Sequence, residues 1–326
     1  MIPLIALEEH FLSNELLNSG LYPGDKLAKN NPTVHKTLSA VDESRLENMN
    51  RNSISIQVLS HIPVNPPLNA VQQTNDLLHS YTNKFPDRFK GFALLSMNDP
   101  AEAAQELERS VKELGFVGAL VGAHLDDGGY YDGSRYDVFW AKAQELDVPI
   151  YLHPHYPSDQ EVALNYSDMD NNVVAMHFAC WCWGWHAKVG LCIMRMFANN
   201  VFERFPKLKI IIGHMGEMIP FMLRRIVDYS KTWPNDQART RGLREVWESN
   251  IWVTTSGFFA LGPMACLLQE TKIDRIMYSV DYPLAKNEDG LKFMQELEAS
   301  GLVDREGFEK IAYKNAEKLL GIKVKQ

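Results

Sequence analysis

Several features that mark other protein classes are scarce or missing in this sequence. Positive charge is not in excess, because 33 Lys and Arg face 41 Asp and Glu, giving a formal net charge of -8. A function based on binding phosphate backbones or anionic lipid is therefore not expected. The first apolar run, MIPLIALEEHFL, is too short to span a bilayer and has no basic flank. We expect a soluble, cytoplasmic protein without nucleic-acid or membrane partners.

Cysteine is also scarce, and CxxC spacing is missing. The four cysteines are Cys180, Cys182, Cys192 and Cys266. They fit buried thiols in a reducing compartment better than a disulfide framework or an iron–sulfur centre. Neither GxGxxG nor GxxxxGK[ST] stands at a strand-to-helix turn, which disfavours nucleotide binding. With no Pro-, Gly- or Ser-rich linker, we expect residues 1–326 to form a single domain.

What the sequence does contain is a recurring unit: a short apolar, β-branched run, a polar loop and an amphipathic stretch of helical period. The predicted strands are Leu4–Glu9, Ile54–His61, Phe89–Ser96, Val117–Gly122, Val148–His153, Leu208–His214, Ile251–Gly257 and Ile276–Asp281. Strict strand–helix alternation favours an α/β protein with a closed (β/α)8 TIM barrel, and an open doubly wound sheet is the alternative.

Two segments between the strands make specific predictions. Pro100 follows Asp99 at the start of an acidic, amphipathic stretch, which predicts a helix capped by Asp99. The segment Ser158–Val173 is polar and irregular, and we predict a loop over the mouth of the barrel.

Ionisable residues stand at the carboxyl ends of the predicted strands, where a barrel enzyme has its chemistry. Glu8 and His10 are two residues apart and so share one side of the first strand. The other strand ends carry His61, His124, His153, His214 and Asp281. One such histidine would more often be structural, but five histidines converging with two carboxylates indicate a site for Zn²⁺ or Mn²⁺, with Mg²⁺ as a further candidate.

The segment CWCWGW, Cys180–Trp185, allows two interpretations. Its cysteines and tryptophans are the residue types of a buried core. Trp181, Trp183 and Trp185 could instead form an aromatic wall for a planar substrate at the barrel mouth. The sequence leaves both interpretations open.

Six segments together resemble the metal-dependent aromatic acid decarboxylases of the amidohydrolase superfamily. They are ALEEHF, PDRFKGFALLSMNDP, ELDVPIYLHP, FPKLKIIIGHMGE, NIWVTTSG and DRIMYSVDYP. The resemblance covers nearly the whole chain and is greatest to the γ-resorcylate, 2,3-dihydroxybenzoate and salicylate decarboxylases. Aminocarboxymuconate semialdehyde decarboxylase is more distant, because it begins with His-x-His where this chain has Glu8-Glu9-His10.

The resemblance implies roles for residues that match the family motifs. The implied ligands of one divalent ion are Glu8, His10, His153 and Asp281. Asp281 would also be the catalytic acid, and His214 and Glu217 would lie beside the metal. Arg225 would lie near the substrate, and we add Trp185 and His61 as candidates for substrate contact. A homodimer or homotetramer is implied as well.

The activity implied is non-oxidative decarboxylation of an ortho-hydroxybenzoate to the phenol and CO₂, with a dihydroxybenzoate, salicylate or orsellinate type of substrate. The alternatives are metal-dependent hydrolysis of a lactone or amide on the same barrel and, less favoured, a non-catalytic metal-binding protein. Gly122 stands where similar decarboxylases carry Asn, and Ala179–Ala187 is unlike their sequences. The ring substituents of the substrate therefore stay open.

Overall fold

The computed structural model describes residues 2–18, 32–167, 169, 171–234 and 239–325. Its strands are β1 (Leu4–Phe11), β2 (Ile54–His61), β3 (Phe89–Gly91), β4 (Ala93–Leu94), β5 (Ala119–Gly122), β6 (Ile150–His153), β7 (Ile210–Ile212), β8 (Ile251–Thr254) and β9 (Ile276–Met277). All pairs are parallel, in the orders β1-β2-β3 and β4-β5-β6-β7-β8-β9. Only Phe92 separates β3 from β4, so these two segments are one strand of the fold.

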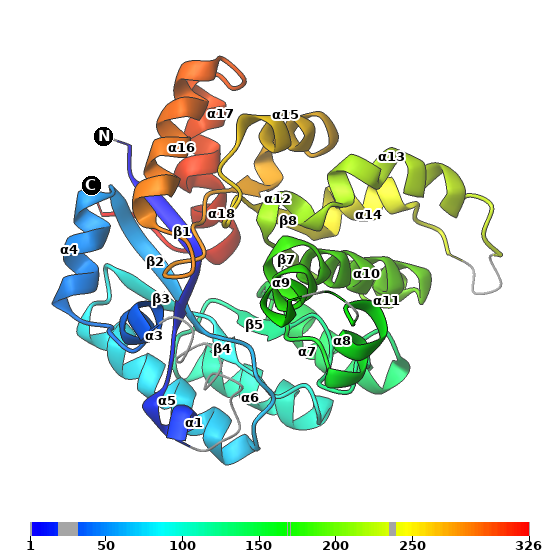
Figure 1. Cartoon of the computed structure of the whole chain (residues 1–326), viewed down its shortest axis with the longest axis horizontal. Helices are drawn as coiled ribbons and strands as arrows, with labels where there is room; N and C mark the ends of the chain where they lie inside the picture. Colours follow the sequence, from blue (N-terminus) through cyan, green and yellow to red (C-terminus); the bar gives the residue numbers. More distant parts are fainter. Residues whose placement is uncertain (1, 19–31, 168, 170, 235–238, 326) are drawn as a thin grey trace.

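The first and last strands meet and close the sheet. Glu9 of β1 forms a parallel bridge with Tyr282, just beyond β9, and the His10 amide donates to the Tyr282 carbonyl at 2.7 Å. Counting β3 and β4 as one, the described residues form eight strands around a barrel (Figure 1). The predicted TIM barrel is confirmed, and each predicted strand overlaps an observed one, although several observed strands are shorter, such as β9, which ends at Met277 rather than Asp281.

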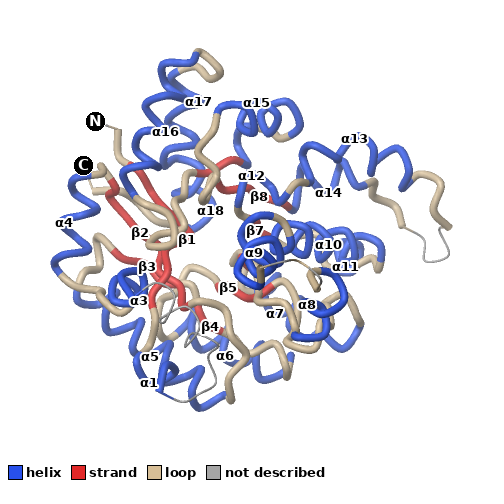
Figure 2. Tube along the Cα trace, viewed as in Figure 1, coloured by secondary structure: helices blue, strands red, loops and turns tan. Residues whose placement is uncertain are grey.

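Helices surround the barrel on its outside (Figures 1 and 2). They are α1 (Asn14–Asn18), α3 (Pro32–Leu38), α4 (Glu43–Arg51), α5 (Leu68–Lys84), α6 (Pro100–Lys112), α7 (Asp137–Glu145), α8 (Asp159–Asn165), α9 (Asn172–His177), α10 (Gly184–Ala198), α11 (Val201–Arg204), α12 (His214–Glu217), α13 (Ile219–Ser230), α14 (Leu243–Asn250), α15 (Leu261–Glu270), α16 (Asn287–Ser300), α17 (Arg305–Glu309) and α18 (Asn315–Leu320). Short 3-10 turns span Ser134–Tyr136 and Ile273–Arg275, and π-helical turns span Phe178–Cys182 and Lys310–Lys314. Among the described residues, no helix has both the length and the apolar character that a membrane span needs.

One local prediction is confirmed and one is partly wrong. The Asp99 carboxylate accepts from the amides of Ala101 and Glu102 at 2.9 and 3.1 Å, so it caps α6. The segment Ser158–Val173 is not wholly a loop, because it contains α8 and the start of α9. The Ser158 hydroxyl caps α8 by accepting from the amide of Glu161 at 3.2 Å. A polar sequence therefore forms a short capped helix there.

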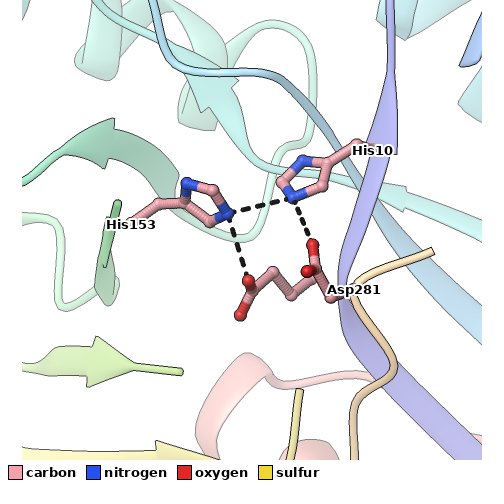
Figure 3. A group of neighbouring side chains, drawn as sticks. His10, His153 and Asp281 are labelled. Carbon is pink, nitrogen blue, oxygen red and sulfur yellow. Dashed lines mark hydrogen bonds and ion pairs between the residues drawn. The ribbon is translucent and has the colours of Figure 1, made fainter. Parts of the chain in front are cut away.

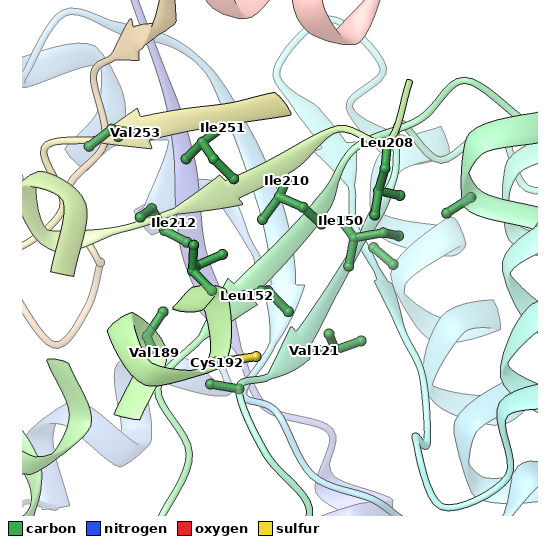
Figure 4. Packing of buried hydrophobic residues seen from close by; sticks show 14 of the residues in the cluster. Val121, Ile150, Leu152, Val189, Cys192, Leu208, Ile210, Ile212, Ile251 and Val253 are labelled. Carbon is green, nitrogen blue, oxygen red and sulfur yellow. The ribbon is translucent and has the colours of Figure 1, made fainter. Parts of the chain in front are cut away.

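Both faces of the strands are buried, which explains their apolar runs. On β7, Ile210 and Ile212 pack outward in the layer between strands and helices, together with Cys192 of α10 (Figure 4). Ile211 faces the other way, into a second cluster inside the barrel. Residues of α18, among them Leu319, belong to that inner cluster.

Candidate metal centre and substrate pocket

Four of the predicted site residues meet at the carboxyl end of the barrel. Glu8 and His10 belong to β1, His153 ends β6, and Asp281 follows β9. Their candidate ligand atoms all lie within 4.8 Å of one another. The Nε2 atoms of His10 and His153 are 3.1 Å apart (Figure 3). His10 Nε2 is 3.1 Å from Asp281 Oδ1, and His153 Nε2 is 3.1 Å from Glu8 Oε1.

A bulge in β1 decides which of its side chains reach the interior. Leu7 packs in the inner cluster, so strict alternation would turn Glu9 inward and Glu8 outward. The pairing with β2 shifts register over this stretch, and the Ser279 hydroxyl accepts from the amides of both Leu7 and Glu8, at 3.0 and 2.7 Å. The bulge reverses the alternation, and Glu8 and His10 face the barrel interior.

The donor atoms fit a divalent cation. His153 Nδ1 donates to the carbonyl of Pro154 at 2.8 Å, which leaves the lone pair of this ring on Nε2. Glu8 Oε1 and Asp281 Oδ1 are buried and have no hydrogen-bond partner among the described residues. Two imidazole nitrogens and two carboxylate oxygens that face one another are typical of Zn²⁺ and Mn²⁺ sites. A candidate metal site is therefore present.

The four groups shift one another's pKa values. Burial alone would raise the pKa of Asp281, but the neighbouring imidazoles of His10 and His214 outweigh burial and hold that pKa well below its usual range. Burial alone would lower the pKa of His153, yet the neighbouring carboxylate of Glu8 raises it. The pKa of His10 is lowered, because burial dominates there. Asp281 is therefore ionised, as a metal ligand must be.

His214 and Glu217 lie beside this group on a left-handed turn. The five residues 214–218 all have positive φ, between 49° and 90°, a conformation that costs about 1–3 kcal/mol per non-glycine residue and is concentrated at functional sites. The turn brings His214 Nδ1 within 2.7 Å of Glu217 Oε1. His214 Nε2 then lies 3.6 Å from Glu8 Oε1 and 3.8 Å from Asp281 Oδ2.

The charges around His214 favour its protonated form. Burial opposes that charge, but Glu217 and Glu8 outweigh burial and raise the pKa of His214 well above its usual value. The pKa of Glu217 is lowered, because His214 and His186 outweigh the effect of burial on the carboxylate. The raised pKa thus favours a charged imidazole at 3.8 Å from Asp281 Oδ2.

His186, at the start of α10, is a site residue that the sequence did not reveal. Its Nδ1 lies 2.7 Å from Glu217 Oε2, and its Nε2 lies 3.0 Å from the carbonyl oxygen of Trp181. The only sequence signal is that His186 directly follows the CWCWGW segment. Its contact with Glu217, 31 residues away, depends on how α10 packs beside the left-handed turn.

A pocket lies beside the candidate metal site. It is lined by Ile62, Pro63, His153, Pro154, His155, Tyr156, Trp181, Trp185 and Leu284. The rings of Trp181 and Trp185 meet edge to face with centroids 5.3 Å apart. Trp183 is 55% exposed, whereas Trp185 is 8% exposed. The aromatic-wall interpretation therefore fits Trp181 and Trp185 but not Trp183.

The cysteines match their prediction only in part. All four are free, Cys180 and Cys192 are buried, and Cys266 is partly buried. Cys182 is exposed, so the prediction of a buried thiol is wrong there. It is the last residue of a π-helical turn, next to the exposed Trp183, and faces solvent.

Two other residues predicted to contact the substrate, Arg225 and His61, do not belong to the group of four ligands. Arg225 is exposed on α13, and its guanidinium stacks on Tyr229, 4.7 Å from the ring centroid. The buried face of α13 includes Leu223, and two residues further on the helix has turned by roughly 200°. His61 donates from Nδ1 to the carbonyl of the next residue at 2.7 Å and packs edge-on against Phe11. Arg225 is thus turned to solvent in this chain, whereas His61 is buried near His10: burial lowers the pKa of His61 to about 4, and His10 adds to that effect. Contact of either residue with the substrate stays a prediction.

Comparison with known proteins identifies the family. The amidohydrolase family model matches residues 67–322. The chain belongs to the amidohydrolase family. Decarboxylase orsB of Emericella nidulans is 48% identical over 99% of this chain and 98% of its own length. The γ-resorcylate decarboxylase of Rhodococcus jostii is 36% identical over 86% of this chain and 88% of its own length.

A solved structure agrees with these relatives. Dihydroxybenzoic acid decarboxylase from Polaromonas sp. JS666, with bound manganese and the inhibitor 2-nitroresorcinol, matches with a TM-score of 0.85 and 30% identity, over 98% of this chain and 97% of that one. The predicted resemblance to the aromatic acid decarboxylases is confirmed. The chain is a decarboxylase of the amidohydrolase family.

Proposed function

We propose that the enzyme decarboxylates an ortho-hydroxybenzoate of the dihydroxybenzoate, salicylate or orsellinate type to the phenol and CO₂, without an oxidant. The observation that carries the proposal is the convergence of four ligand atoms within 4.8 Å of one another, next to a pocket walled by Trp181 and Trp185. Aromatic walls suit a planar ring, and the ligand group suits its anionic oxygens.

Glu8, His10, His153 and Asp281 would hold one divalent ion, for which we propose Mn²⁺ or Zn²⁺, with Mg²⁺ as a further candidate. Manganese is bound in the Polaromonas relative. When bound, the ion supplies Lewis-acid polarisation of the substrate's oxygens. Direct loss of CO₂ from a benzoate would leave an aryl carbanion, so the ring carbon that bears the carboxylate must first be protonated.

Asp281 and His214 would supply that proton. Asp281 is a poor acid by itself, because its pKa is held well below the usual range. The charge on His214 is favoured by its acidic neighbours, and its Nε2 stands 3.8 Å from Asp281 Oδ2. A proton transfer from His214 to Asp281 runs against both pKa shifts in the substrate-free site, so we place it after the substrate has bound. Asp281 then protonates the ring carbon, the carbon–carbon bond breaks with its electron pair returning to the ring, and CO₂ leaves. Glu217 keeps the His214 ring oriented through Nδ1.

We extend the proposal to a homodimer or homotetramer. Phe221 on α13 is 83% exposed, and Met222 and Tyr229 on the same helix are also exposed. A row of large apolar side chains on one helix is typical of a protein–protein interface. Light scattering after size exclusion would give the mass, and a monomer at micromolar concentration would contradict this part of the proposal.

The test of the activity is a substrate panel. Metal-loaded and chelator-stripped enzyme is incubated with 2,6-dihydroxybenzoate, 2,3-dihydroxybenzoate, salicylate and orsellinate, and the phenol and CO₂ are measured. Metal-dependent CO₂ release from at least one acid is the expected result. No release from any of them, together with hydrolysis of a lactone or amide panel, would replace the lyase by a hydrolase.

A further inference from the structure

His186 lies at a junction between the proton-handling residues and the pocket wall. It is buried and makes one polar contact with each: Nδ1 is 2.7 Å from Glu217 Oε2, and Nε2 is 3.0 Å from the Trp181 carbonyl. Its ring also meets that of His214 with centroids 4.8 Å apart. His186 does not belong to the group of four metal-ligand candidates. It lies instead in a second group, with His214 and Glu217.

The Glu217 carboxylate is shared between two imidazoles. Oε1 is 2.7 Å from His214 Nδ1, and Oε2 is 2.7 Å from His186 Nδ1. A carboxylate that makes only one such contact can turn about its terminal torsion, whereas one held through both oxygens cannot. The contact with His186 thus fixes the plane of Glu217, and Glu217 fixes the ring of His214.

Both neighbours of the His186 ring are acceptors. The Trp181 carbonyl can only accept, and Glu217 accepts in its ionised form. The two hydrogen bonds tie the π-helical turn that ends at Cys182, and with it the Trp181 side of the pocket, to the left-handed turn that carries His214.

We infer that His186 is a positioning residue: through Glu217 it holds the imidazole of His214 with Nε2 toward Asp281, in the geometry needed to pass a proton. This inference rests on the proposed decarboxylation, in which His214 supplies the proton. His186 itself belongs neither to the group of four ligands nor to the residues that line the pocket. Loss of its contact with Glu217 should therefore lower kcat and leave KM nearly unchanged.

The test separates the two contacts of the ring by substitution. In His186→Asn the side-chain amide nitrogen takes the place of Nδ1 and keeps a donor for Glu217. In His186→Gln the amide nitrogen takes the place of Nε2 and keeps a donor for Trp181 only, and His186→Ala keeps neither. The matched control is His79→Ala, since His79 also makes two ring hydrogen bonds, to the Leu114 carbonyl at 3.0 Å and to Asn83 at 2.8 Å, but on α5.

We expect kcat to fall roughly 10-fold to 100-fold in His186→Ala and His186→Gln. Removing a residue that orients a functional side chain by a hydrogen bond has an effect of this size in other metal sites. His186→Asn should recover most of that loss, and His79→Ala should keep wild-type kcat. Bound metal should stay at one ion per chain in every variant. Equal kcat in the Asn and Gln variants would overturn the inference, because it would mark a packing role. A second ion lost with His186 would overturn it as well, because His186, His214 and Glu217 would then be ligands.

If the wild-type enzyme releases no CO₂ from any acid of the panel, the proposed function is refuted, but the inference about His186 is not. Crystal structures of the same variants then test the inference. The His214 ring should keep its orientation in His186→Asn and turn away from Asp281, or become disordered, in His186→Gln. An unchanged His214 ring in His186→Gln would overturn the inference independently of any activity. If His186→Ala does not fold, the comparison of Asn with Gln still decides.

Discussion

The Nε2 atoms of His10 and His153 lie 3.1 Å apart, although His10 belongs to β1 and His153 to β6, 143 residues later in the sequence. Each of these nitrogens also faces a carboxylate oxygen at 3.1 Å. Two imidazole nitrogens this close together repel each other unless one of them carries a proton or a cation lies between them and the carboxylates. The arrangement is therefore that of a candidate cation site.

Replacing His153 should remove the metal. His153→Gln is expected to lower metal affinity by more than about 100-fold and to abolish turnover. This loss is larger than the one caused by replacing a residue that only hydrogen-bonds to a metal ligand. Bound metal is measured by mass spectrometry of the dialysed protein. The matched control is His124→Gln, because His124 also donates from Nδ1 to the next carbonyl, at 2.8 Å, but does not belong to the ligand group. Full metal content in His153→Gln would contradict the assignment.

Asp281→Asn separates ligation from proton delivery. The amide oxygen can still bind a cation, but the side chain can no longer accept a proton from His214 and pass it on. Turnover should fall below detection while metal content stays largely intact. Loss of both together would mean that Asp281 is mainly a ligand. Metal analysis and CO₂ release on the same preparation decide between these outcomes.

Metal binding should depend on pH through His153. The pKa of this ring is raised above its ordinary value by Glu8, so without metal the ring is protonated below that raised pKa. A cation needs the Nε2 lone pair and must displace the proton. Affinity should therefore rise with pH, by about tenfold per unit while one proton is released, and level off above the raised pKa. Calorimetry in two buffers of different ionisation enthalpy counts the proton, and a pH-independent affinity between pH 6 and 8 would contradict the coupling.

Trp185 should affect substrate binding more than the chemical step. Trp185→Ala removes a buried indole from the pocket wall, and we expect KM to rise by about tenfold, equivalent to about 1.4 kcal/mol. Trp183→Ala is the matched control, since Trp183 is two residues away and largely exposed. Steady-state kinetics with one active acid measures both. Equal effects of the two substitutions would show that Trp185 does not line the substrate site.

The sequence predicted the barrel and its strand ends because both depend on local patterns. A β-branched apolar run marks each strand, and the residue that ends it must lie at the mouth of a parallel barrel. His153 and Asp281 could be placed in this way. Glu8 and His10 could be placed on one common side, but the side that faces inward depends on the β1 bulge, which has no sequence signal in a single chain.

Other parts of the site depend on tertiary packing and could not be predicted. His186 acquires its role through contacts with Glu217 and the Trp181 carbonyl, which form only when α10 packs against the left-handed turn. Gly122 matters because an added Cβ would lie 3.1 Å from the side chain of His155, a contact between the end of β5 and the segment that follows β6. Arg225 lies on the exposed side of α13, opposite the buried Leu223, a placement that depends on how this helix packs. Its contact with the substrate stays a prediction.

The most direct test of the central claim is the stoichiometry of CO₂ and phenol formed from one ortho-hydroxybenzoate by the same enzyme in three states: metal-loaded, chelator-stripped and reloaded with Mn²⁺. The account predicts one CO₂ per phenol in the loaded state, no turnover after stripping and recovery on reloading. Equal CO₂ release from stripped and loaded enzyme, or consumption of the acid without CO₂, would contradict it.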